Sequence, residues 1–166
     1  DFDAEERAEI ARKVGLAALK FGDLQNQRLT NYIFDPQRFT AFEGKTGPYL
    51  LYAAVRIKSI LRKAETLGVK AGDITISDPS ETGLVLALDS FDRALTGAAT
   101  KYSPHILCDH IYGLAQAFSR FYTDCPILQD GVADEVKSSR LALAQTTLRQ
   151  LEAGLNIIGI EVPERM

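Results

Sequence analysis

The sequence has few cysteines and no long apolar run, and both shortages exclude classes of protein. Cys108 and Cys125 are too few for a disulfide scaffold, so reduced thiols in a cytosolic protein are expected. No apolar stretch approaches the ~20 residues that span a bilayer, which excludes a membrane-spanning chain. No basic and then apolar leader is visible, so no secretory signal is expected. Because the first residue is Asp1, we expect a processed protein or a piece of a longer one.

An excess of basic residues is also missing. The net charge is −3 and the sequence pI is about 5.4, which argues against a broadly basic surface for non-specific binding to nucleic acid. Any contact with nucleic acid must therefore use a local patch. With 46% hydrophobic and 25% charged residues, the 166-residue chain has ordinary globular composition and is long enough to bury a core.

What the chain does contain is apolar spacing at the helical period. Together with helix-start signals such as Asp35-Pro36 and Asp78-Pro79, this spacing predicts helices that begin near 3, 36, 48, 79, 91, 104 and 132. A short extended segment is expected near 28–34, and the irregular stretch 67–77 is the best candidate for a linker. No strand–helix alternation supports a parallel sheet. The predicted fold class is therefore all-α, a helical bundle.

One cluster of metal-binding residue types lies at 105–110. His105, Cys108 and Asp109 share a helix face, but His110 lies roughly 140° from His105 at ~100° per residue. Cys125 would lie ~25 Å from Cys108 along a continuous helix. Three ligands on one helix do not close a structural zinc site, so a buried cysteine beside surface histidines is favoured and no metal is expected.

Two other signals for chemistry are weak. Cys108 and His105 could touch, but no glycine-rich elbow and no third orienting group accompany them, so a Cys–His hydrolase is the least favoured alternative. The stretch 44–47 contains Gly-Lys-Thr without the upstream glycine and the preceding strand of a phosphate-binding P-loop. A glycine-rich turn before a helix is the better interpretation. The sequence therefore predicts no catalytic residue in this chain.

A polar stripe on the predicted helix from 48 to about 65 is the strongest candidate for binding. An aromatic ring among cations can stack on a base and hold phosphates. A solvated helix face with one stray tyrosine would have the same spacing, and periodicity alone favours that plainer interpretation. The stripe consists of Tyr52, Arg56, Ser59 and Lys63, with Lys58 and Arg62 close by.

Two strings of the sequence are specific enough to indicate a family. The first is Glu-Gly-Lys-Thr-Gly-Pro-Tyr-Leu-Leu-Tyr at 43–52, and the second is the terminal Glu-Arg-Met at 164–166. Shorter matching stretches lie at 14–21, 56–61, 118–122, 140–143 and 159–163. In this order, and over nearly the whole chain, they resemble the C-terminal part of arginyl-tRNA synthetase, a class I aminoacyl-tRNA synthetase.

The resemblance implies a helical bundle of the DALR anticodon-binding type. It assigns 1–44 to a helical segment that joins the catalytic domain, and 45–166 to the anticodon-binding bundle. The family's Rossmann catalytic domain carries His-Ile-Gly-His-like and Lys-Met-Ser-Lys-Ser-like signatures, and neither occurs here. The chain is thus expected to be a fragment that needs no cofactor itself. Its cytoplasmic parent would ligate arginine to tRNA with ATP and Mg²⁺.

The resemblance also assigns site residues. Tyr52 and Tyr122 would contact anticodon bases, Arg56 a base edge or a phosphate, and Met166 would pack as an apolar wall against a base. Where some members have an aromatic residue four positions after Tyr122, this chain has Pro126. Candidate phosphate contacts are Lys58, Arg62 and Lys63.

The expected partners are the anticodon loop of tRNA(Arg) and the parent's own catalytic domain, with no membrane and no DNA. The agreement between the polar stripe and the family's Tyr52 and Arg56 favours an RNA-binding function. The alternative that remains open is a helical protein-interaction module without RNA binding, which the acidic pI favours.

Overall fold

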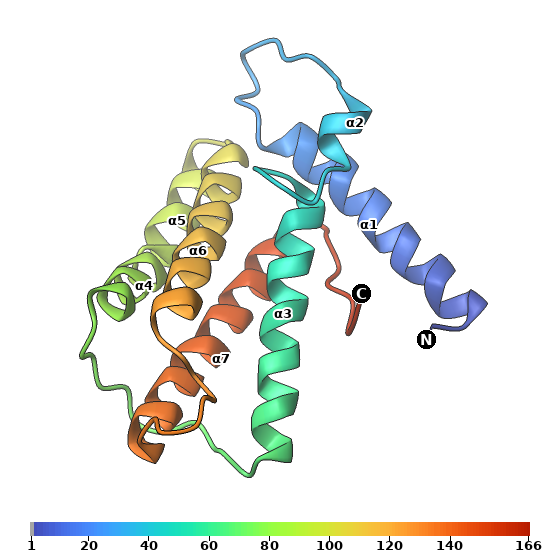
Figure 1. Cartoon of the computed structure of the whole chain (residues 1–166). Helices are drawn as coiled ribbons and strands as arrows, with labels where there is room; N and C mark the ends of the chain where they lie inside the picture. Colours follow the sequence, from blue (N-terminus) through green and yellow to red (C-terminus); the bar gives the residue numbers. More distant parts are fainter. Residues whose placement is uncertain (1) are drawn as a thin grey trace.

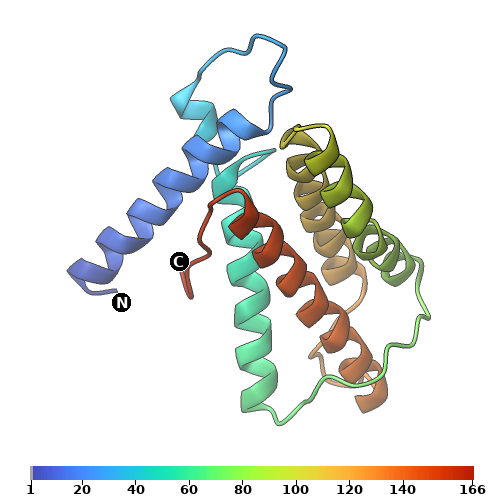
Figure 2. The same cartoon turned by 180° about the vertical axis from the view of Figure 1, so that it is seen from behind.

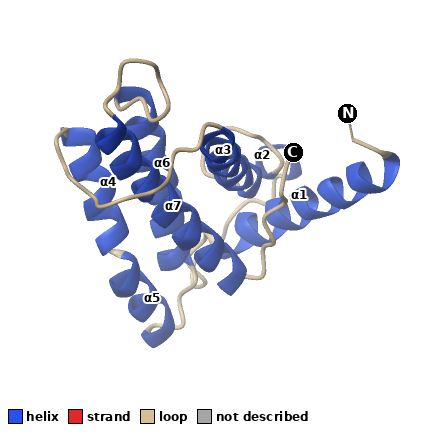
Figure 3. Ribbon diagram, turned by 90° about the horizontal axis from the view of Figure 1, so that it is seen from below, coloured by secondary structure: helices blue, strands red, loops and turns tan. Residues whose placement is uncertain are grey.

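All regular secondary structure in residues 2–166, the part of the chain that the structure describes, is helical. In that range, the computed structural model contains seven helices and no strand (Figure 3), which confirms the all-α prediction. No helix there has the length and apolarity needed to span a lipid bilayer. The helices are α1 (Ala4–Leu24), α2 (Pro36–Phe39), α3 (Gly47–Thr66), α4 (Pro79–Asp89), α5 (Phe91–Thr100), α6 (His105–Asp124) and α7 (Asp134–Ile157).

Local capping chemistry sets several of the helix starts. Asp3 caps α1 and Asp78 caps α4, where Glu81 completes a capping box. α3 begins at Gly47, one residue earlier than the proline signal predicts, because the hydroxyl of Thr46 accepts a hydrogen bond from the first turn. The stretch 67–77, predicted as a linker, is irregular and joins α3 to α4.

The segment near 28–34, expected to be extended, forms no strand. Residues 28 and 29 lie in a turn, and residues 31–35 have no regular secondary structure. The rings of Tyr32 and Phe34 lie 6.3 and 5.3 Å from that of Phe39 in α2, and the Tyr32 hydroxyl donates to the Asp23 carboxylate at 2.6 Å. Tyr32 and Phe34 therefore pack their rings on a short helix, and this segment forms no strand.

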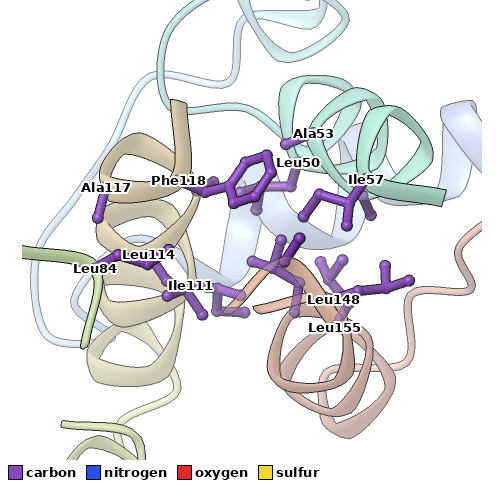
Figure 4. Packing of buried hydrophobic residues seen from close by; sticks show 14 of the residues in the cluster. Leu50, Ala53, Ile57, Leu84, Ile111, Leu114, Ala117, Phe118, Leu148 and Leu155 are labelled. Atoms are coloured by element: carbon purple, nitrogen blue, oxygen red, sulfur yellow. The ribbon is translucent and has the colours of Figure 1, made fainter. Parts of the chain in front are cut away.

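α3, α6 and α7 surround one hydrophobic core, and α4 packs on α6 from outside. Figure 4 shows Leu50 and Ile57 of α3 directed toward Phe118 of α6 and Leu148 of α7. Leu50 and Ile57 have no exposed surface, so the predicted apolar face of this helix is confirmed. Because α3 buries this face, its opposite face is left for solvent or for a ligand.

α1 joins the bundle through its C-terminal half, while its N-terminal half extends away from it (Figure 1). Phe21 is fully buried in the same core as α3. At the crossing point, a Cβ atom added to Gly47 would lie 2.1 Å from the carbonyl oxygen of Ala17. The backbones of the two helices can approach this closely only because residue 47 is glycine.

Beyond α7 the chain reverses and runs back between α1 and α3 (Figure 2). Gly159 has a φ of +73°, and the Ile160 N–H donates to the Leu155 carbonyl at 2.9 Å, which ends the helix in the way glycine favours. Residues 159–166 are called the C-terminal tail below. Near its end, Arg165 donates two hydrogen bonds of 2.6 Å to the Glu6 carboxylate of α1.

Candidate nucleic-acid interface

The polar stripe of α3 faces away from the core. Tyr52 is 51% exposed, Ser59 and Lys63 are exposed, and Arg56 is partly buried. Leu50 and Ile57, which have no exposed surface, lie on the opposite side of the helix, while Val55 and Ile60 are buried at the margins of the stripe. The stripe therefore presents an aromatic ring, a hydroxyl and two cations on one surface.

The structure brings Arg56 and Tyr122 into direct contact although they lie on different helices. The guanidinium carbon of Arg56 is 4.2 Å from the centroid of the Tyr122 ring, a cation–π geometry. One turn earlier on α6, the Phe118 ring lies at 6.1 Å and 24° to the Tyr122 ring. Tyr122 is thus partly buried between the core and Arg56, and it is fixed in orientation by both.

A hollow of about 270 Å³ adjoins Tyr122 and reaches from the C-terminal half of α3 to the loop after α6. Its walls are mostly apolar with one cation, a composition that suits a planar ring attached to an anionic backbone. Sequence reasoning did not find the loop residues, since Pro126 indicates a helix end but not the direction of the chain after it. The hollow is lined by Ile60, Lys63, Tyr122, Ile127, Leu128 and Gln129.

Lys58 and Arg62 lie on a different side of α3, roughly 120° and 80° from Tyr52 at ~100° per residue. Lys58 forms ion pairs of 3.0 Å with Glu152 of α7 and of 2.6 Å with Glu164 of the C-terminal tail. Burial alone would lower the pKa of Lys58, but the hydrogen bonds to these two carboxylates outweigh burial and raise it. Lys58 is therefore charged, and its charge is compensated within the protein.

Arg62 and Met166 are both associated with the C-terminal tail. Arg62 donates to the backbone carbonyl of Glu164 at 3.1 Å. Met166 is partly buried and packs against the core cluster, and the tail ends beside α3 (Figure 1). The sequence-predicted residues thus form two groups, one at Tyr122 and one at the tail.

Both histidines and Cys108 lie in the N-terminal half of α6, whereas Cys125 follows the helix and precedes the loop that lines the hollow. Burial raises the pKa of Cys108 to about 12 and that of Cys125 to about 11, so both thiols are poor nucleophiles. Neither cysteine is in a disulfide. Burial also lowers the pKa of His110, whose ring packs against Phe91. Within residues 2–166, no group of three or more His, Cys, Asp or Glu side chains is arranged to hold a metal ion.

The glycine-rich stretch 44–47 serves to join elements. Lys45 forms an ion pair with Asp109 of α6, and Thr46 donates to the Ala41 carbonyl at 2.6 Å while it caps α3. Gly44 has a φ of +77°. These contacts use the side chains that a phosphate loop would direct at its ligand, in agreement with the interpretation as a turn.

Comparison with known proteins assigns the chain to a family. The profile of the DALR anticodon binding domain matches residues 50–166. The chain is 59% identical to the arginine–tRNA ligase of Maricaulis maris and 56% identical to that of Hyphomonas neptunium, over all of this chain in both cases. It spans 28% of the length of each of these relatives.

The solved structures give the same result. Thermus thermophilus arginyl-tRNA synthetase superposes with a TM-score of 0.84 at 33% identity, over 95% of this chain and 27% of that one. The arginyl-tRNA synthetase of Plasmodium falciparum, at 23% identity and a TM-score of 0.82, has the same fold over 95% of this chain and 28% of its own. The chain therefore belongs to the DALR anticodon binding domain family, in the form found in arginyl-tRNA synthetases.

Proposed function

We propose that this chain binds the anticodon loop of tRNA(Arg) on the surface formed by α3 and α6. The observation that carries the proposal is the contact between Arg56 and Tyr122 next to the hollow. It joins two residues that the family resemblance assigns to the anticodon site and that lie on different helices. The family match favours this function over a protein-interaction module without RNA binding.

Each residue of the surface has a physical role in the proposal. The exposed ring of Tyr52 stacks on a splayed anticodon base, which is worth ~1–3 kcal/mol per base. Tyr122 is held by Arg56 and Phe118, so it offers an edge and its hydroxyl to a base in the hollow. Arg56 and Lys63 supply positive charge for a base edge and for the phosphates.

The tail group is a second, finer part of the proposal. Met166 packs against a base as an apolar wall, at the end of a tail that is already ordered on α3. For Lys58 and Arg62, contact with phosphates requires competition with Glu164, which now accepts hydrogen bonds from both. Arg62 and Lys63, which are exposed, are the more accessible phosphate partners.

The proposal extends to the parent protein. It is an arginine–tRNA ligase of the cytoplasm, in which residues 1–44 join the catalytic domain to the bundle. Its ATP and Mg²⁺ would be bound by the catalytic domain, whose two signatures this sequence lacks. The role of this chain is recognition.

Titration of the chain and its variants with tRNA(Arg) tests the proposal directly. We expect Tyr52→Ala to weaken binding about 5- to 150-fold, the equivalent of one lost stacking contact, with a nearly unchanged melting temperature. Tyr102→Ala is the matched control, since Tyr102 is a 76% exposed tyrosine at the α5–α6 turn. Binding should weaken as salt is added, because phosphate contacts release counterions. Unchanged affinity together with a sharply lower melting temperature for Tyr52→Ala would contradict the proposal.

A further inference from the structure

A buried ion pair lies behind the wall of the hollow and does not reach the RNA surface. Glu81, at the start of α4, is 1% exposed, and Arg140 of α7 donates from Nε to its Oε1 at 2.7 Å. The other carboxylate oxygen accepts the backbone N–H groups of Ser77 at 2.8 Å and of Asp78 at 3.1 Å. Both oxygens of Glu81 are therefore occupied, and the carboxylate is fixed in place.

The guanidinium of Arg140 also donates a second hydrogen bond, away from Glu81. Its Nη1 donates to the Pro126 carbonyl at 2.9 Å. Pro126 begins the loop whose next three residues, 127–129, line the hollow beside Tyr122. A neighbouring contact between the Ser80 hydroxyl and Asp124, at 2.6 Å, ties the start of α4 to the end of α6. The start of α4 and α7 thus hold the loop from behind.

The chemistry of the pair suits this placement better than a purely stabilising role. An apolar pair of similar volume is often as stable as a buried Arg–Glu pair, or more stable, because removing two charges from water is costly. An apolar pair cannot form directional hydrogen bonds. The planar guanidinium has five donors at fixed angles, so one side chain can hold a carboxylate and a backbone carbonyl at the same time.

We propose that Glu81 and Arg140 are positioning residues for RNA recognition. Glu81 orients the guanidinium of Arg140, and Arg140 holds the Pro126 carbonyl so that Ile127, Leu128 and Gln129 keep the hollow open beside Tyr122. This inference rests on the proposed function of the α3–α6 surface. It adds two residues that do not line the hollow, and the resemblance, although its stretch 140–143 includes Arg140, gives neither of them a role.

The test uses the double variant Glu81→Leu/Arg140→Met in the 166-residue chain. It removes both charges together, so that neither is left unpaired in the interior. The melting temperature should fall, because the Ser77 and Asp78 N–H groups lose their acceptor, and at a temperature where the variant is folded tRNA(Arg) binding should be about 2- to 10-fold weaker, the range of one lost hydrogen bond. Arg149→Met is the matched control, because Arg149 is an exposed arginine of the same helix.

A second measurement keeps the inference testable if the double variant is less stable. The backbone amide resonances of 127–129 should move in that variant without RNA, while those of the C-terminal tail stay in place. Unmoved loop resonances, or full tRNA affinity with the pair removed, would overturn the positioning role. The proposed function is judged separately by Tyr52→Ala in the same titration. If the unmodified chain does not bind tRNA(Arg), the function and this inference both fail.

Discussion

The two sides of α3 are held in different ways. On the side of α6, here the α6 flank, Arg56 lies over Tyr122 and the loop 126–129 is fixed by Glu81 and Arg140. On the other side, here the tail flank, the C-terminal tail is held by ion pairs with Lys58 and with Glu6, and by the packing of Ile160 and Met166 on the core. The side chain of Glu81 is 1% exposed, whereas that of Glu164 is 82% exposed.

This difference in exposure determines how much each carboxylate depends on its partners in the protein. A carboxylate inside the protein loses its hydration on folding and depends on its partners, so breaking its pair is costly. A carboxylate at the surface exchanges a protein partner for water at little cost. The α6 flank is therefore a preformed wall, while the tail flank can release its partners to a competing phosphate.

The largest effect on stability is expected when the carboxylate of the α6 flank is removed, compared with removal of the carboxylate of the tail flank. Glu81→Ala leaves the Arg140 charge unpaired in the interior and should lower the free energy of unfolding by about 3–5 kcal/mol. Glu164→Ala, with an exposed side chain, should cost ~0–1 kcal/mol. Urea denaturation of both variants measures the difference. Equal losses would show that burial does not separate the two flanks.

Tyr122→Ala should give the next largest effect, because it acts on binding and on folding together. The ring packs on Phe118 and under Arg56, so its removal opens space in the α6 flank and lowers the melting temperature. Binding of tRNA(Arg) should weaken about 5- to 150-fold, as for one lost base contact. Tyr122→Phe is the control that keeps the ring, and it should retain most of the stability. If Tyr122→Ala has the same melting temperature as the unmodified chain, Tyr122 does not contribute to the packing of the α6 flank.

Acid should weaken the α6 flank through Glu81. Burial acts to raise the pKa of Glu81, but the hydrogen bonds from the Ser77 N–H and from Arg140 outweigh it, and the pKa is lowered from its ordinary value of 4.5. Because the folded-state pKa is lower than the unfolded one, this stabilisation is fully present above about 4.5 and is lost as pH falls through the folded-state pKa.

Denaturation at pH 7 and at successively lower pH, below 4.5, measures this loss, with Glu81→Gln as the comparison. The unmodified chain should lose more stability over this interval than Glu81→Gln does, since the amide does not titrate. Parallel curves for the two proteins would exclude Glu81 as the group responsible.

The sequence predicts the parts of this molecule that depend on neighbours in the chain. Asp3, Asp35 and Asp78 cap helices that begin one residue later, and the buried and exposed faces of α3 follow from its spacing. The segment near 28–34 was the exception, because its aromatic side chains suit a strand and a helix cover equally. The residue types of a short segment do not show whether it forms a strand or packs on a neighbouring helix.

Contacts between distant residues could not be predicted in the same way. Lys58 and Glu164 are 106 positions apart, and Arg140 and Glu81 are 59 apart. Nothing in the spacing around Lys58 indicates that two carboxylates compensate its charge. The hollow combines α3, α6 and the loop after α6, so its lining depends on the packing angles of those elements. The resemblance identified Tyr52, Arg56 and Tyr122, but it did not reach Ile127, Leu128 or Gln129.

The smallest expected effect is the response of the tail flank to salt. At 1 M ionic strength the screening length is only about 3 Å, so the pair of Arg165 with Glu6 and the pair that the exposed carboxylate of Glu164 forms with Lys58 should weaken. Hydrogen exchange of the tail amides should then become faster, while exchange in the loop 126–129 stays the same, since Glu81, the carboxylate that orients Arg140 toward the loop, is buried. Arg165→Ala should remove part of the salt response of the tail. If loop and tail amides respond equally to salt, the α6 flank is not the preformed wall that its buried pair indicates.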